Sequence, residues 1–267
     1  MVKNLNLFIL LSIGVLMACN SKIKEIKDEI YSRHLQKHIP ITIISTPTPK
    51  NKSDFNLLLL NDGEKINQSE LKKMLDSLNR KKLIKPFIIV CIGAFDASQE
   101  FGVAGFPDSQ NKGTLAKKYS DFIVNELLPF TKKKAGVRKF NSVSIAGSGI
   151  AGISALDIAW DNWQKFDKVG FLPDFSKENS TVDFSILAKK ISQSRKRPRL
   201  QFWLNVMDDL KNPQRKDSSG MDKLFEVLYI KGVQGITKSG MEGDKHADIP
   251  FKDTFSQFLF WLGDKNS

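Results

Sequence analysis

Residues 145–152 read Ile-Ala-Gly-Ser-Gly-Ile-Ala-Gly, and this stretch decides the fold class. It follows an expected strand over 142–146 and precedes an expected helix over about 150–166. In a tight turn between a strand and a helix, the central residue takes a strained positive φ, and small flanking residues let the two elements approach closely. Gly147 to Ala151 form such a turn, with Gly149 at its centre. Taken alone, a turn of this composition is also typical of phosphate-binding loops.

Short apolar runs alternate with helix-period segments along the rest of the chain. The expected strands are 39–45, 55–61, 87–94, 142–146, 169–172, 200–206 and 227–231. The expected helices cover 71–78 after a Ser69 cap, 115–130, 150–166, 184–191 and 255–262. The strand runs are continuously apolar, as strands covered on both faces should be. This order predicts an α/β fold with a mostly parallel central sheet and helices on both faces, whose binding site lies beyond the carboxyl ends of the strands.

Several motifs, in order along residues 30–262, resemble the esterase D and enterochelin esterase branch of the α/β-hydrolases. Leu57–Gly63 is similar to that family's strand ending in Asp-Gly, and Phe122–Pro129 to its helix ending in Glu-Leu-Ile-Pro. Gly243–His246, which an aromatic-rich helix follows, is similar to its glycine–histidine segment. The resemblance implies an α/β-hydrolase fold in which Gly147–Ala151 is the Gly-x-Ser-x-Gly nucleophile turn.

The resemblance also implies a serine-hydrolase triad from which the nucleophile is missing. Such a triad needs a hydroxyl, an imidazole that takes its proton and a carboxylate that orients the imidazole, in the chain order nucleophile, acid, base. The nucleophile position falls on Gly149, which has no side chain, and the base position on His246. Asp209 is the favoured acid, and its neighbour Asp208 stays open as the alternative. No metal and no cofactor is expected at this site.

The oxyanion hole of such a site is built from backbone donors, which survive the substitution of side chains. Its expected donors are the N–H of Ile150 and one N–H in the loop at Gly63. Ser148 is the fallback nucleophile, but it stands one position early in a tight turn, so its side chain should not meet His246. A displacement of about 1 Å costs on the order of a hundredfold in rate.

A second departure from the family lies after the third of these strands. The family often places an arginine three residues before a glutamate there; Glu100 is present, but Ala97 stands where that arginine would be. The loop Asp96–Gly113 is long for a connection and should overhang the pocket. It is either a lid or an irregular surface loop.

The amino terminus is expected to be an export signal and not part of the fold. The apolar run Leu7–Met17 is too short to span a bilayer but suits a signal-peptide core. Leu16–Cys19 resembles a bacterial lipoprotein processing site, which implies acylation of Cys19 and a membrane anchor. We therefore expect a signal peptide over 1–18, a tether or first helix over 19–33 and an esterase-like domain over 34–267. This lipoprotein would be exported, with the outer membrane or cell surface favoured over the inner membrane.

The formal net charge is +12, with local runs at Lys132–Lys134 and Arg195–Arg199. Such scattered charge on an exported protein indicates a solvated basic face that favours an anionic membrane surface, and no nucleic-acid partner is expected.

Cys91 lies in an apolar run and is expected to be a buried strand residue. With Cys19 acylated, Cys91 has no disulfide partner in the chain.

Two functions of different classes remain open. The first is a catalytically silent protein that binds a small ester, a sugar-like ligand or a protein partner in the former active-site pocket. The second is a working hydrolase of carboxylic esters or acylated sugars that uses Ser148 or a water activated by His246. A scaffold role in which the pocket has no part is the third reading.

Overall fold

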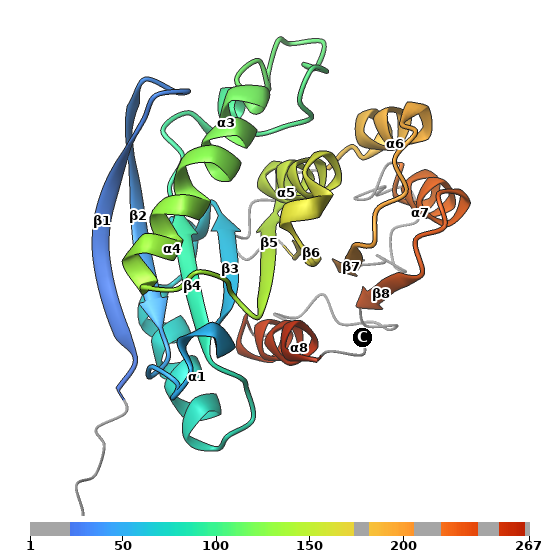
Figure 1. Cartoon of the computed structure of the whole chain (residues 1–267). Coiled ribbons are helices and arrows are strands. Elements are labelled where there is room, and N and C mark those ends of the chain that lie inside the picture. Colours follow the sequence, from blue (N-terminus) through green and yellow to red (C-terminus); the bar gives the residue numbers. More distant parts are fainter. Residues whose placement is uncertain (1–21, 174–181, 206–219, 240–250, 265–267) are drawn as a thin grey trace, which may run out of the picture.

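The computed structural model describes residues 22–173, 182–205, 220–239 and 251–264. Its strands form an eight-stranded sheet in the order β1-β2-β4-β3-β5-β6-β7-β8 (Figure 1). They are β1 Lys24–Ser32, β2 Lys37–Ser45, β3 Asn56–Asn61, β4 Phe87–Ile92, β5 Ser142–Ser148, β6 Lys168–Leu172, β7 Gln201–Asn205 and β8 Gly235–Ser239. The pairs β1–β2 and β2–β4 are antiparallel and the remaining pairs are parallel. The predicted mostly parallel sheet is confirmed.

Helices connect these strands. They are α1 Gln68–Arg80, α2 Ala97–Glu100, α3 Ala116–Phe122, α4 Leu128–Ala135, α5 Gly149–Asp161, α6 Ser185–Gln193, α7 Met221–Ile230 and α8 Phe251–Gly263. A π-helical turn, Ile123–Leu127, joins α3 to α4 and gives one continuous rod. None of the helices in the described ranges is long and apolar enough to cross a membrane.

The two faces of the sheet bury separate apolar cores. Along β3, Leu57 and Leu59 face a core shared with α3 to α7, whereas Leu58 and Leu60 face a core shared with α1 and α8. This alternation follows from the two-residue period of a strand. Because all four leucines are fully buried, the strand reads as a continuous apolar run.

Two sequence expectations for elements are wrong. Lys24–Ser32, expected as a tether or first helix, is edge strand β1, paired along its whole length with β2. The expected strand 227–231 is instead the last turn of α7, because Val227 and Leu228 continue the helical spacing of Met221 and Leu224. A short apolar run does not distinguish a strand from a buried helix turn.

The N-cap of helix α1 lies two residues before the expected cap, Ser69. The side chain of Asn67, not that of Ser69, accepts a hydrogen bond from the Glu70 N–H at 3.1 Å. Asn67 has the extended backbone that an N-cap requires, whereas Ser69 lies inside the first turn.

The Glu-Leu-Leu-Pro motif, residues 126–129 at the end of the family-like segment Phe122–Pro129, has a structural role. Glu126, in the π-helical turn, accepts the backbone N–H of Arg33 at 2.9 Å through Oε1. It therefore ties the turn between β1 and β2 to the helical rod in front of the sheet. The motif supports the fold at a point away from the glycine-rich turn.

Candidate functional site

The glycine-rich turn has the geometry that the sequence predicts. Strand β5 ends at Ser148, whose backbone is extended (φ −118°, ψ 159°), and helix α5 begins at Gly149. Gly149 has a φ of +55°, in the left-handed region that side chains disfavour. The turn is therefore a strand–helix elbow at the carboxyl end of β5, with Gly149 at its strained position.

Two further glycines make the elbow tight. A Cβ on Gly147 would lie 2.7 Å from the carbonyl carbon and oxygen of Ala151, closer than real Cβ contacts. A Cβ on Gly152 would lie 2.5 Å from the ring of Phe171 on the neighbouring strand β6. The close approach of strand and helix thus depends on Gly147 and Gly152. The small residue expected at Ala151 is not sufficient by itself.

Backbone donors gather around the elbow. Ile150 is the second residue of α5, so its N–H has no acceptor within the helix, and Ser148 does not cap the helix with its side chain. Gly63 follows strand β3, which is the neighbour of β5 in the sheet. A Cβ on Gly63 would lie 2.8 Å from the Cα of Cys91, so the loop packs closely on β4 at this point. The two expected oxyanion donors therefore follow adjacent strands at the same sheet edge.

Asn61 connects these two strand ends, a role that was not predicted from the sequence. Its side chain is buried and donates to the carbonyl of Ala151 in the first turn of α5 at 3.2 Å. Its own carbonyl accepts the hydroxyl of Tyr119 at 3.0 Å. Burial raises the pKa of Tyr119 well above its usual range, so the hydroxyl stays a donor. The only sequence signal for Asn61 is a polar residue that ends the run Leu57–Leu60.

Glu100, whose expected partner arginine is absent, pairs with a lysine from strand β2 instead. Glu100 is fully buried and accepts Lys37 Nζ at 2.7 Å; this lysine comes from β2 and not from the loop. The same carboxylate accepts the backbone N–H groups of Phe95 at 3.4 Å and of Asp96 at 3.2 Å. Ala97 is packed against the core. Lys37 therefore supplies a cation to Glu100, and Glu100 holds the turn after β4.

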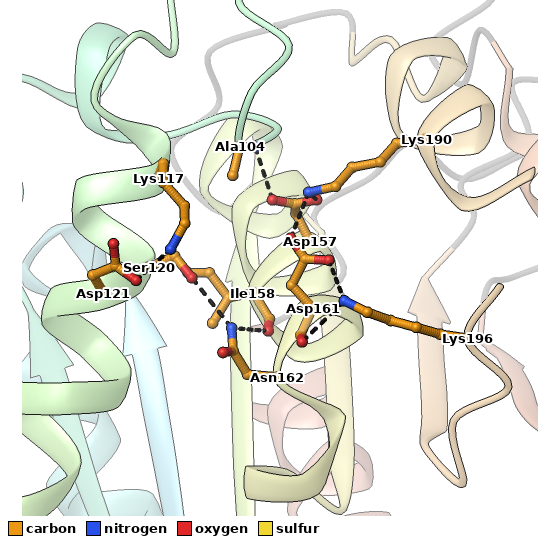
Figure 2. Close-up of polar contacts among 10 residues, drawn as sticks. All are labelled: Ala104, Lys117, Ser120, Asp121, Asp157, Ile158, Asp161, Asn162, Lys190 and Lys196. Atoms are coloured by element: carbon orange, nitrogen blue, oxygen red, sulfur yellow. Dashed lines mark hydrogen bonds and ion pairs between the residues drawn. The ribbon is translucent and has the colours of Figure 1, made fainter. Parts of the chain in front are cut away.

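Part of the long loop after β4 is fixed to the body of the protein. Figure 2 shows Asp157 of α5 between the N–H of Ala104, at 2.8 Å, and the ammonium of Lys190 on α6. Asp161, one turn further along α5, accepts Lys190 at 2.8 Å and Lys196 at 2.7 Å. The loop is buried over 101–104 and mostly exposed over 105–112. Any lid movement would involve that exposed part.

Three of the expected site residues lie outside the described residues: His246, Asp208 and Asp209. Cys19 is outside them as well. The segments that hold the two aspartates and His246 follow β7 and β8, whose parallel pairing ends at Asn205 and Ser239 on the same edge as the elbow. Their triad roles remain predictions.

Cys91 is buried in β4 as expected, and burial raises the pKa of its thiol to about 12.

The fold and the elbow together define the class of protein. A mostly parallel sheet covered on both faces, with a strand–turn–helix elbow at its carboxyl edge, is an α/β-hydrolase fold. A family model described as a putative esterase matches residues 32–214, which is more than half of the chain. The chain belongs to this esterase family. No curated protein matches the sequence.

Solved structures of esterases share the fold. A ferulic acid esterase superimposes with a TM-score of 0.64 at 18% identity, covering 91% of this chain and 99% of its own. An enterobactin esterase from Shigella flexneri, determined in the presence of enterobactin, gives a TM-score of 0.68 at 19% identity. That match covers 91% of this chain and 59% of the enterobactin esterase. An enterobactin hydrolase in complex with DFP gives 0.62 at 14% identity, covering 91% of this chain and 96% of its own.

Proposed function

We propose that this protein is a membrane-tethered esterase-family member that has lost covalent catalysis. It binds a small carboxylic ester or an acylated-sugar ligand, or a protein partner, in the former active-site pocket. The observation that carries this proposal is Gly149, which occupies the positive-φ position of the elbow and offers no nucleophilic atom.

Ser148 is a poor substitute for the missing hydroxyl. It is the last residue of β5 and has an extended backbone, while the turn occurs at the next residue. Successive side chains of an extended chain point to opposite sides. A hydroxyl on Ser148 therefore leaves the strand in a different direction from a side chain on Gly149.

Backbone groups support binding without a covalent step. The first N–H groups of α5 have no acceptors within the helix, and a helix amino terminus favours a negative or partly negative oxygen. An ester carbonyl placed there would be held by the same donors that stabilise an oxyanion in an active esterase. The absence of a side chain at Gly149 leaves these backbone donors in place.

The competing proposal is a working hydrolase that uses Ser148 or a water activated by His246. The observation in its favour is that Ser148 is half-buried and directly precedes the helix that carries these donors. Such an enzyme would rely on general-base and oxyanion effects. Turnover would then require His246, whereas simple ligand binding would not require proton transfer.

A chromogenic short-chain ester separates the two proposals. We expect saturable binding of aryl and acyl-sugar esters, measured by equilibrium dialysis, with the bound ester recovered intact. Hydrolysis above background that disappears in both His246→Ala and Ser148→Ala would establish the serine-dependent hydrolase. Loss in His246→Ala alone would establish the water mechanism. Either result contradicts our proposal, and the absence of binding by every ester of the panel would exclude a small-molecule ester as the ligand and leave a protein partner as the occupant.

Restoring the hydroxyl tests the alignment of the elbow. Gly149→Ser places a hydroxyl at the positive-φ position, and Gly149→Ala is the matched control with the same Cβ and no oxygen. Both should lose about 1 kcal/mol of unfolding free energy, since a side chain in the left-handed region is strained by that amount. Gain of fluorophosphonate labelling by the serine variant alone supports the elbow assignment, and equal labelling of both variants counts against it.

A further inference from the structure

We propose that the amino-terminal end of the sheet is a docking face for an anionic lipid surface, so that the pocket faces away from the membrane. We call this end, formed by the loops that precede the parallel strands, the basic face. The proposal goes beyond the proposed function because it concerns the opposite end of the sheet from the elbow.

The loops of the basic face lie side by side. The N–H of Asn141, before β5, donates to the carbonyl of Phe55, before β3, at 2.8 Å. The N–H of Gln201, which starts β7, donates to the carbonyl of Asp167, before β6, at 3.1 Å. The charges that these loops carry therefore lie on one continuous end of the molecule.

These loops carry cations without carboxylate partners. Lys81 and Lys82 precede β4, Arg138 and Lys139 precede β5, and Lys165 precedes β6; all five side chains are exposed. Within the described part of the chain, none of the five forms an ion pair. A lysine at the end of a helix is also attracted to the helix dipole, which is another reason for a cation to stand there. That attraction fades beyond the last turn. The loop residues Arg138, Lys139 and Lys165 lie outside any long helix.

The segment before β7 adds a stripe of arginines. Arg195, Arg197 and Arg199 are exposed, whereas Lys196 pairs with Asp161 and Pro198 is buried. This alternation is that of an extended chain with every second side chain on one side. The three guanidinium groups thus face solvent together, and the described residues provide no carboxylate for them.

The carboxyl end of the sheet is different in charge. Lys37 there pairs with Glu100 at 2.7 Å, and Lys65 pairs with Asp62 at 2.9 Å. These two cations beside the elbow are neutralised, whereas the lysines and arginines named above on the basic face, apart from Lys196, have no carboxylate partner among the described residues.

Apolar side chains accompany the unpaired cations. Leu83, between α1 and β4, is 54% exposed, and Tyr229 and Ile230, in the last turn of α7, are 81% and 62% exposed. All three stand in segments that lead into strands from the amino end. Exposed leucine, isoleucine and tyrosine among lysines and arginines suit the boundary between headgroups and acyl chains.

The chain enters the fold at this same end. Strand β1 is antiparallel to β2, which is antiparallel to β4, so β1 runs in the direction of the parallel strands and starts at their amino end (Figure 1). Cys19 precedes Lys24 by so few residues that the connection reaches at most about 18 Å. An anchor at Cys19 would hold the basic face, and not the pocket, against the lipid surface.

Vesicle binding by an unlipidated protein tests whether the basic face binds anionic lipid without help from an anchor at Cys19. The chain from residue 20 onward contains every described residue and carries no acyl group. We expect it to sediment with phosphatidylcholine vesicles that contain phosphatidylglycerol, and not with phosphatidylcholine alone. Binding at about 0.1 M salt should be lost near 1 M, where the Debye length falls to about 3 Å.

A charge-matched pair of variants locates the contact. Arg195→Gln/Arg197→Gln/Arg199→Gln should weaken vesicle binding on the order of tenfold to a hundredfold, since each cation near an anionic surface contributes about fivefold. Lys112→Gln/Lys117→Gln/Lys118→Gln removes the same charge at the carboxyl end and should change binding by less than about threefold.

Three outcomes would overturn the proposal: equal weakening by both triple variants, equal binding to neutral and anionic vesicles, or binding of duplex DNA or dextran sulfate without binding of vesicles. The last result would assign the face to a soluble polyanion. None of these outcomes bears on ester binding or turnover, so failure here is distinguishable from failure of the proposed function.

Discussion

At the scale of single residues, the three glycines of the elbow have separate roles. Gly149 accepts the positive φ of the turn, Gly147 lets the strand meet the first turn of α5, and Gly152 makes room for Phe171. The positive φ at Gly149 could be predicted from the motif. The contact of Gly152 with Phe171 could not, because only the pairing of β5 with β6 brings that ring beside α5.

Gly147→Ala should lower the free energy of unfolding by about 2 kcal/mol, because its Cβ would overlap the Ala151 backbone, which cannot rotate away. The smaller entropy of unfolded alanine offsets less than about 1 kcal/mol of this. Gly263→Ala is the control, since its Cβ would meet only Lys85 Cγ at 3.9 Å. Urea unfolding measures both variants. Equal stability of the two would refute the close approach at Gly147.

Lys37→Met should cost about 3 kcal/mol, because it leaves the buried carboxylate of Glu100 without its cation. The double variant Lys37→Met/Glu100→Gln should recover most of that loss, because no charge remains buried. Chemical denaturation of the two single variants and the double variant gives the coupling energy. Additive losses would show that the pair has no interaction worth measuring.

At the scale of elements, α5 joins the elbow to the loop after β4 and to helix α6. Its first turn carries the elbow donors, and its middle binds the loop at Ala104 and helix α6 through Asp157 (Figure 2). Asp157 is almost completely buried, and desolvation raises its pKa to about 6, against the opposing effects of Lys190 and the Ala104 N–H. No sequence pattern indicated this network.

The raised pKa of Asp157 predicts a pH dependence of stability. Between its ordinary pKa of 3.8 and about 6, the folded state binds more protons at Asp157 than the unfolded state does. The free energy of unfolding should therefore fall as pH rises through this window, by up to about 3 kcal/mol from this group.

Asp157→Asn removes this dependence, because asparagine does not titrate. The comparison is made by urea unfolding of the two proteins at several pH values from 4 to about 7. The wild-type curve should fall relative to the variant as pH rises. Parallel curves, or a relative rise, would contradict a raised pKa at Asp157.

Elements were predicted well where periodicity was unambiguous. The buried strands β3, β4 and β5 and helix α1 were located from continuous apolar runs and helical spacing. Strand β1 was missed because an edge strand with one solvated face carries many charges, as at Lys24, Lys27 and Glu29. Helix α7 was mistaken for a strand where its apolar side chains become consecutive.

At the scale of the whole molecule, the fold places two surfaces at opposite ends of one sheet. The elbow lies at the carboxyl end, and unpaired cations gather at the amino end, where the chain also enters. The sequence revealed the elbow and the charge excess but not their separation. That separation depends on strand order and direction, which no local pattern records.

The lipid anchor predicted at Cys19 can be tested by substitution of that cysteine. Cys19→Ala should leave the protein unprocessed or release it into the soluble fraction, because acyl chains on that cysteine would supply most of the membrane affinity of a lipoprotein. Fractionation of cells that express each form, with Cys91→Ala as the matched control, measures the effect. Cys91 is buried in β4, so the control tests loss of a thiol that cannot be acylated in the folded protein. Unchanged membrane partition of Cys19→Ala would refute acylation at that site.

Intact-mass measurement after treatment with a fluorophosphonate shows whether the protein has lost covalent catalysis, as we propose. The probe forms a covalent adduct only with an activated hydroxyl, and Gly149 provides none. We expect the wild-type protein to keep its unmodified mass under conditions that label an active serine esterase completely. A stoichiometric adduct mapped to Ser148 would show that the neighbouring serine has become the nucleophile, and would contradict the loss of covalent catalysis.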